Sequence, residues 1–157
     1  MRRPMHYELY MSAALAEARE GTAAGERPDG AVAVLDEAMV ARGHERVRAT
    51  GDPTAHAVVL TVREAAKRLG RSSLEGVTVF SAMEPCAMCV GALLESDADA
   101  LVFAVPDPVS GAAGSAVQLT QGDALKRRLR VVSGIMQTEA AEVIRVPGPA
   151  VAGRATR

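Results

Sequence analysis

Short apolar runs alternate with stretches of helical periodicity in this chain, and this alternation restricts its fold more than any other feature of the sequence. Three runs suited to buried strands lie at residues 31–35, 77–80 and 100–105. Helices are predicted before, between and after these runs, at about 5–20, 54–69, 86–95 and 136–145. Because helices must cover a buried sheet, the alternation predicts a three-layer α/β/α domain.

Two further strands are predicted beside these runs. Asp36 and Glu37 have the character of a turn, so the run before them and residues 39–41 after them are expected to form a hairpin. Residues 130–132 are expected to form the last strand. Residues 106–122, rich in Pro, Gly, Ser and Ala, are predicted to form a long loop.

The size and charge of the chain limit its class. A length of 157 residues suits one domain over 1–157, with residues 146–157 expected to form a flexible tail. Aromatic residues make up 3% of the chain and Trp is absent, so Ala, Val, Leu and Met must build the core. The formal net charge of -1 gives no overall field that attracts nucleic acid or anionic lipid.

The N-terminal residues and the two cysteines indicate a compartment. Arg2 and Arg3 precede a charged, amphipathic segment, not an apolar signal core, and no stretch is long enough to cross a membrane. A cytoplasmic location is therefore expected. In a reducing compartment, two closely spaced cysteines bind metal or perform redox chemistry more often than they form a structural disulfide.

Three residues form a candidate metal site. Cys86 and Cys89 are separated by two residues at the predicted start of a helix, so one helical turn can present both thiolates to one ion. His56 follows Asp52 and Pro53, which are predicted to be the N-cap and first residue of the helix at 54–69. His56 is then expected within the first turn of that helix. Two Cys and one His would hold one zinc ion per chain and leave a fourth position open, as catalytic zinc sites do.

Taken separately, each part of this pattern has a less specific interpretation. A lone His at a helix start is more often a surface or capping residue, and a lone Cys-x-x-Cys can be a thioredoxin-like redox pair. The combination, with a predicted strand between the two helix starts and Pro85 before Cys86, favours zinc.

The chain resembles the zinc-dependent cytidine and deoxycytidylate deaminase superfamily, and above all its bacterial tRNA adenosine deaminases and guanine-type nucleobase deaminases. The resemblance lies in residues 52–57, 84–89, 91–93 and 107–115, and covers about 5–145. It implies a five-stranded mixed sheet with helices on both faces, and a homodimer formed through helices beside the site. It also implies hydrolytic deamination, in which a zinc-activated water attacks a ring carbon and ammonia leaves.

Val58 departs from the motif of that superfamily. The motif reads His-x-Glu, and its glutamate carries protons between the attacking water, the ring nitrogen and the leaving group. Valine cannot accept or donate a proton, so classical deamination is expected to be strongly impaired. Four explanations stay open: a natural non-catalytic partner subunit, like the Val-containing subunit of the eukaryotic tRNA adenosine deaminase; an introduced inactivating change; another acid in its place; or altered chemistry at the zinc.

Three glutamates are candidates for the missing acid. Glu45 is the strongest, because it follows the second predicted strand near the expected pocket. Glu84 is interpreted as structural in a strand-to-helix turn, and Glu64 as a surface partner of Arg68 at i, i+4. For each of the three, a solvated surface position is the simpler interpretation.

The substrate prediction depends on Glu45 and on composition. By the resemblance, Glu45 and Ala57 are the candidate substrate-binding residues. The tRNA-acting members of the superfamily resemble the chain but have Asn at position 45. A carboxylate accepts hydrogen bonds without donating any. A ring edge with N–H donors, as in guanine, would therefore fit Glu45. Because two Tyr and two Phe are the only aromatics, a nucleobase, nucleoside or related heterocycle is favoured over tRNA.

Overall fold

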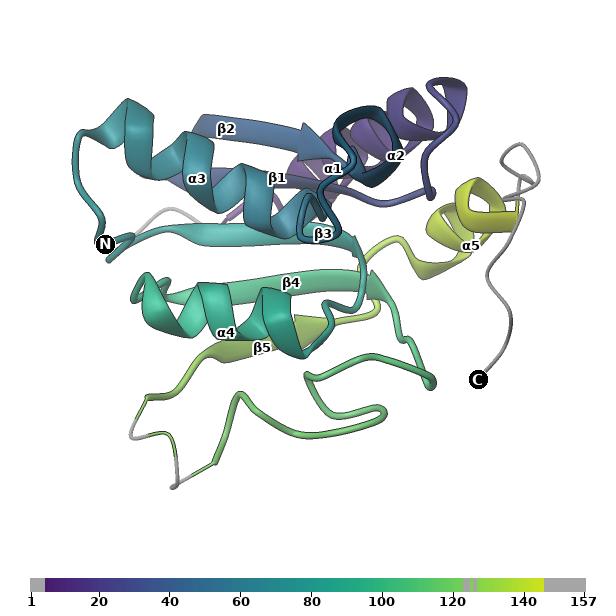
Figure 1. Ribbon diagram of the computed structural model, residues 1–157. Helices are drawn as coiled ribbons and strands as arrows, with labels where there is room; N and C mark the ends of the chain where they lie inside the picture. The colour runs from purple at the N-terminus through teal and green to yellow at the C-terminus, as the bar shows by residue number, and fades with distance from the viewer. Residues whose placement is uncertain (1–4, 123–124, 126, 146–157) are drawn as a thin grey trace.

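Five strands form one mixed sheet, and helices cover both of its faces (Figure 1). The computed structural model describes residues 5–122, 125 and 127–145; the predicted tail at 146–157 lies outside the described residues. The sheet order is β2-β1-β3-β4-β5, with β1 antiparallel to β2 and β3, and β3, β4 and β5 parallel. The elements in chain order are α1 (Tyr7–Ala23), β1 (Gly30–Leu35), β2 (Ala38–His44), α2 (Val47–Thr50), α3 (Ala57–Leu69), β3 (Thr78–Met83), α4 (Ala87–Glu95), β4 (Ala100–Val105), β5 (Arg130–Ser133) and α5 (Gln137–Arg145).

Side chains that alternate along the strands build two apolar cores. Ala31 and Ala33 of β1 pack on one face of the sheet, with apolar residues of α3 and α4. Val32 and Val34 point to the other face, where α1 and α5 cover them. This period of two is what a sheet buried on both faces requires. The predicted three-layer α/β/α architecture and its five-stranded mixed sheet are confirmed.

The hairpin between β1 and β2 has the predicted turn, since Asp36 and Glu37 both have positive φ, of 48° and 65°. Two consecutive residues with positive φ suit a two-residue hairpin connection. None of the described helices is long and apolar enough to span a bilayer.

The predicted start of the helix at 54–69 is wrong. Helix α3 begins at Ala57, and His56, with extended φ and ψ of -74° and 151°, is its N-cap residue. Asp52 instead closes a local turn, in which its Oδ1 accepts hydrogen bonds from the N–H and Oγ1 of Thr54 at 2.8 and 2.7 Å. An Asp side chain can bond to backbone two residues later as readily as it caps a helix. The segment between β2 and α3 also contains the short helix α2.

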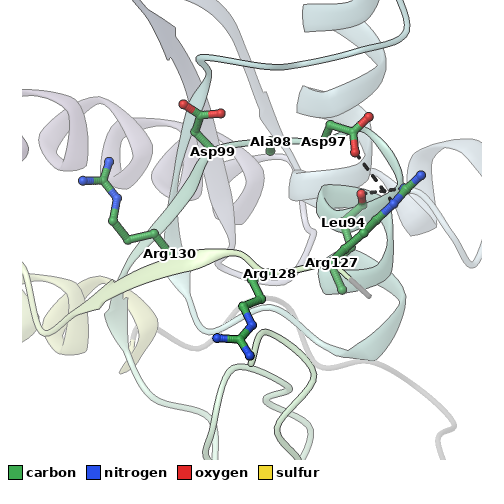
Figure 2. Close-up of a pocket in the computed structure, with 7 residues that line it drawn as sticks. All are labelled: Leu94, Asp97, Ala98, Asp99, Arg127, Arg128 and Arg130. Carbon is green, nitrogen blue, oxygen red and sulfur yellow. Dashed lines mark hydrogen bonds and ion pairs between the residues drawn. The ribbon is translucent and has the colours of Figure 1, made fainter. Parts of the chain in front are cut away.

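Three arginines, Arg127, Arg128 and Arg130, lie at the start of β5 and are exposed. The described residues 127–129 lead directly into β5, and Lys126 lies outside the described part of the chain. Arg127, Arg128 and Arg130 line an open cleft of about 500 Å³ together with Asp97 and Asp99 (Figure 2). The cleft lies where α4 ends and where β4 and β5 begin. It is therefore at the N-terminal ends of these strands, whereas α4 starts beside the C-terminal end of β3.

Three chain segments meet beside the C-terminal end of the central strand β3. Strand β3 ends at Met83, three residues before Cys86. Because β1 is antiparallel to both of its neighbours, its start lies beside the end of β3 and beside the end of β2, where Gly30 pairs with His44. Asp29 and Glu45 are therefore brought to the edge from which the first turn of α4 leaves.

Gly30 lets α1 approach the sheet closely, and Gly30→Ala is expected to lower the free energy of unfolding by about 3 kcal/mol, the upper end of overpacking costs. A Cβ atom at this position would overlap the backbone of Ala14, Glu17 and Ala18, which cannot move without shifting α1. Gly91→Ala is the control, since a Cβ there meets nothing within 4 Å and helix propensity favours Ala by about 1 kcal/mol. Urea unfolding of the three proteins measures both changes; equal stability of the two variants would contradict the close approach.

Candidate metal centre

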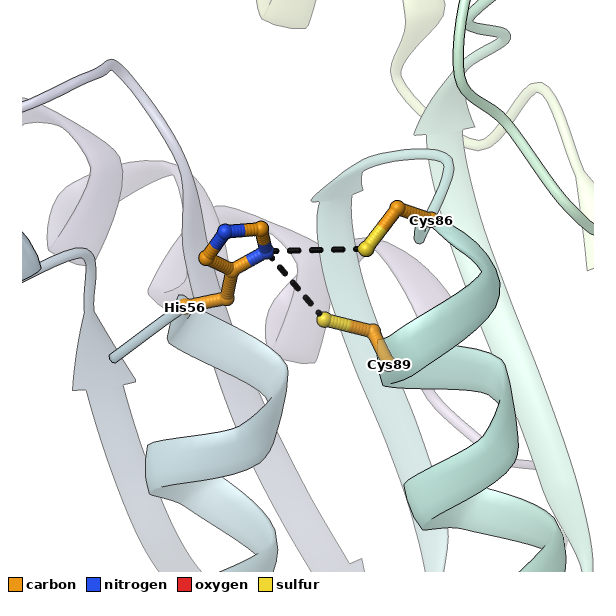
Figure 3. Close-up of side chains that lie close together, drawn as sticks. All are labelled: His56, Cys86 and Cys89. Atoms are coloured by element: carbon orange, nitrogen blue, oxygen red, sulfur yellow. Dashed lines mark hydrogen bonds between the residues drawn. The ribbon is translucent and has the colours of Figure 1, made fainter. Parts of the chain in front are cut away.

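Two helix N-termini present the three candidate ligands to the same point (Figure 3). His56 is the N-cap residue of α3, and Cys86 is the N-cap residue of α4. Cys89 lies in the first turn of α4, so it points to the same side as Cys86. The first N–H groups of both helices, which lack acceptors within the helix, place the positive ends of two helix dipoles beside the thiols.

The distances among the three side chains fit one tetrahedral ion. Nδ1 of His56 lies 3.6 Å from Sγ of Cys86 and 3.6 Å from Sγ of Cys89. Zinc bonds of about 2.3 Å to sulfur and 2.0–2.1 Å to nitrogen, at a tetrahedral angle, separate S and N by about 3.6 Å. The donor set and its spacing therefore fit zinc, with Nδ1 as the histidine ligand atom.

The two thiols differ in their electrostatics. A hydrogen bond from Cys89 is the main cause that lowers the pKa of Cys86 to about 5, with a smaller contribution from the charge of His56. The same hydrogen bond, and burial, raise the pKa of Cys89. One thiol is therefore ionised at neutral pH before any cation binds, and thiolate is the form that binds metal.

Val58 lies within the apolar core beside the ligands. Its side chain is 0% exposed and packs in the same cluster as Cys89, Val59 and Val90. No group of Val58 can carry a proton, and the valine is in van der Waals contact with the core instead of open to solvent. Ala57, which lies between His56 and Val58 and is the first residue of α3, is also fully buried.

Glu84 has the structural role expected of it, and its interpretation as a solvated surface residue is wrong, since it is 3% exposed. Its Oε2 accepts a hydrogen bond from the N–H of Asp107 at 2.9 Å, and its Oε1 accepts from the N–H groups of Ala113 and Ser115 at 3.0 and 3.1 Å. These bonds hold the loop after β4 against the start of α4. Glu64 is also a partner of Arg68, as expected: its Oε1 lies 2.6 Å from Nε of Arg68, and Glu64 is partly exposed.

Glu84→Gln is expected to lower the free energy of unfolding by about 1–3 kcal/mol, because an amide NH2 would face at least one of the three N–H donors. The loop at 107–115 should also become more sensitive to protease. Glu64→Gln is the matched control, since a surface pair at i, i+4 contributes only about 0.3–0.5 kcal/mol. Urea unfolding and limited proteolysis check this; a Glu84→Gln protein as stable and resistant as the control would contradict the role.

Glu45 is buried, so its alternative interpretation as a solvent-facing residue is wrong. It is 3% exposed, and its Oε1 lies 3.9 Å from Nη1 of Arg27. Burial raises the pKa of Glu45, while the positive charges of Arg27 and His56 oppose the shift. The interactions with His56 and Cys86 place Glu45 in the electrostatic field of the candidate ligands.

Asp29 and Arg27 lie beside Glu45, and neither was predicted as a site residue. Asp29 is 8% exposed, its Oδ1 accepts a hydrogen bond from the N–H of Gly30 at 3.0 Å, and its backbone carbonyl accepts one from the backbone N–H of Glu45 at 3.3 Å. Burial raises the pKa of Asp29 to about 7, against the opposing charge of Arg27. The charge of Asp29 also acts on Cys89. The signal in the sequence that could have indicated Asp29 was its position as an acidic residue directly before a buried strand.

Comparisons with known proteins agree with this geometry. The family model described as the cytidine and deoxycytidylate deaminase zinc-binding region matches residues 4–105. A tRNA-specific adenosine deaminase of Bacillus subtilis is 39% identical over 84% of this chain and 82% of its own length. A guanine deaminase of the same organism is 38% identical over 70% of this chain and 71% of its own length.

A solved structure supports the same assignment. It comes from biochemical and structural studies of A-to-I editing by tRNA:A34 deaminases, and it aligns with a TM-score of 0.83 and 36% identity. The alignment covers 86% of this chain and 98% of that one. The family's zinc-binding region includes His56, Cys86 and Cys89, which supports one zinc ion per chain. The chain belongs to the cytidine and deoxycytidylate deaminase family.

Proposed function

We propose that this protein binds a nucleobase, nucleoside or related heterocycle at its zinc site and hydrolyses a ring amino group of that ligand only slowly. One observation carries the proposal: a ligand set that fits zinc is followed, two residues after His56, by a fully buried valine. The metal-binding half of a hydrolytic site is present, and its expected proton carrier is not.

The reaction adds water to the amino-bearing ring carbon and releases ammonia, leaving a carbonyl at that carbon. A bound zinc ion would supply a nucleophile at neutral pH by lowering the pKa of water. His56, Cys86 and Cys89 would hold it, and the backbone at Ala57, in the first turn of α3, would contact the ligand. Val58 moves no proton, and general acid–base catalysis typically contributes about 10²–10⁴-fold, which sets the size of the expected impairment.

Glu45 is proposed as the group that retains some proton transfer. Glu45 is a buried carboxyl on which the charge of His56 acts. With valine at position 58, the first acidic residue of α3 is Glu64, about two turns further along the helix. A small ligand is proposed because the chain has only two Tyr and two Phe and no Trp, few side chains on which RNA bases could stack. The relatives include both tRNA-specific adenosine deaminases and a guanine deaminase, so both substrate classes belong in the test.

The test measures ammonia release by zinc-loaded protein, in excess over each substrate, from free bases, nucleosides and a tRNA anticodon stem-loop. Slow release from a base or nucleoside, lost in Cys89→Ser and reduced in Glu45→Gln, is expected. Release from the stem-loop alone would overturn the small-ligand assignment. A product without ammonia, such as an opened ring, would indicate altered chemistry at the same metal.

A non-catalytic partner subunit is the second candidate function, and the burial of Val58 favours it. A valine that packs fully in the core stabilises a fold that no longer depends on a charged group at this position. This candidate predicts no ammonia release and an association with an active deaminase. A homodimer in the cytoplasm, where the thiols stay reduced, is proposed for the catalytic case; size-exclusion chromatography with light scattering separates the two assemblies.

A further inference from the structure

One buried acceptor of the pocket lacks a partner. Oε2 of Glu45 is, among the described residues, the buried side-chain oxygen or nitrogen atom that has no hydrogen-bond partner. Buried polar atoms are nearly always hydrogen-bonded, and leaving one without a partner is costly. The atom therefore marks a position where a ligand or water donates a hydrogen bond.

The neighbours of Glu45 provide more acceptors than donors. The Asp29 carboxyl lies at the start of β1, on the same face as Ala31 and Ala33, which is the face that α3 and α4 cover. Arg27 is the one cation that the ion pairs give to Glu45, and at 3.9 Å it reaches Oε1 and not Oε2. Arg27 thus pairs with Glu45, and its charge also acts on the neighbouring Asp29 carboxyl.

Glu26 shows what a satisfied carboxylate looks like in the same region. It is as buried as Glu45, at 3% exposed. Its Oε2 accepts from the N–H of Arg48 at 3.0 Å, and its Oε1 from the N–H of Ala49 at 2.7 Å. Both oxygens are used by the protein itself, which fixes α2. Glu45 differs because the protein leaves one of its oxygens for another molecule.

We propose that Glu45, with Asp29 beside it, forms a subsite that selects heterocycles whose edge carries a ring N–H next to an exocyclic amino group. The subsite rests on the proposed function, since it lies at the zinc site and binds the same ligand. A carboxylate oxygen accepts well from two adjacent N–H groups, and charge-assisted hydrogen bonds are the stronger ones. An edge that presents a bare ring nitrogen or a carbonyl would place lone pairs against Glu45 and leave Oε2 without a donor.

The test compares two probes that differ by one amino group. Isocytosine has the ring N–H beside an amino group, and pyrimidin-4-one lacks the amino group. Equilibrium dissociation constants are measured by calorimetry on zinc-loaded protein, so no turnover is needed. Isocytosine is expected to bind about 10- to 100-fold more tightly, and Glu45→Gln to remove most of that preference. Guanosine and inosine repeat the comparison with purine nucleosides.

Three variants make the comparison specific. Asp29→Asn should reduce the preference in the same direction and by a smaller factor, which gives a second reading if Glu45→Gln folds poorly. Glu26→Gln is the matched control, expected to lower stability and to leave the preference intact. Zinc content and thermal unfolding verify each protein before binding is measured.

Two results would overturn the inference, and they are distinguishable. Binding of both probes without preference, or an equal loss for both in Glu45→Gln, means that Oε2 bonds to water and not to the selected edge, while the proposed function stands. No binding of any base or nucleoside by the zinc-loaded chain overturns the proposed function as well.

Discussion

Val58→Glu is expected to raise the rate of ammonia release by about 10²–10⁴-fold over the native chain, on whichever substrate the native chain binds. Position 58 lies two residues after His56 in the first turn of α3, and its side chain packs in the same cluster as Cys89. A carboxylate there could accept one proton of the attacking water and pass it to the ring nitrogen, and then carry the remaining hydroxyl proton to the amino group, which leaves as ammonia. The binding constant for the substrate should change much less than the rate.

The same substitution has a cost that a control separates from catalysis. Val58 is 0% exposed, so a carboxylate in its place is desolvated, and the variant is expected to be less stable than the native chain. In the Val58→Gln variant the glutamine has nearly the same shape as the introduced glutamate but cannot carry the proton. This variant should therefore share the loss of stability without the gain in rate. Single-turnover ammonia release and thermal unfolding of the three proteins test this. Equal rates in Glu and Gln variants would contradict a role for a proton carrier at this position.

Loss of the metal ligands is expected to have the second large effect. Cys89→Ser should reduce zinc binding, and the free energy of unfolding should fall by about 4 kcal/mol if the native protein is compared at zinc 1,000-fold above its dissociation constant. A zinc ion held by His56 and the two cysteines would link α3 to α4, so its loss would remove one connection between two elements that cover the same face of the sheet.

Chelation supplies the control for that prediction. After EDTA treatment the native chain and Cys89→Ser should unfold at similar temperatures, and added zinc should restore only the native chain. A Cys89→Ser protein that is already less stable than the chelated native chain would indicate a packing loss at a 3% exposed thiol. Native protein whose unfolding temperature ignores both chelator and zinc would contradict a metal link between the helices.

Local signals explain what the sequence could predict. The strands show as apolar runs, and Cys86 and Cys89 are close in sequence, so their meeting at one helix start requires no long-range information. His56 was identified by its place in the motif, although its helix starts later than predicted because Asp52 closes a turn with Thr54. The layers and the metal ligands were therefore predictable before the register of any strand was known.

The remaining pocket residues depend on that register. Asp29 reaches the metal pocket because β1 runs antiparallel to β3, and Glu45 because Gly30 pairs with His44. The local turn predicts that β1 pairs with β2, but the register shift between Ala33 and Val34 and the pairing of β1 with β3 have no local signal. A one-residue slip would turn Asp29 to the other face of the sheet. The charges that distinguish this pocket thus come from strand pairing, while the ligands come from helix starts.

The zinc content of freshly purified native protein tests the central claim most directly. Elemental analysis by mass spectrometry, with protein concentration from amino-acid analysis, should give one zinc ion per chain, and His56→Ala should give far less. A native chain without stoichiometric zinc that also takes up none from a zinc buffer would contradict the metal site formed by His56, Cys86 and Cys89, and with it the function proposed for this protein.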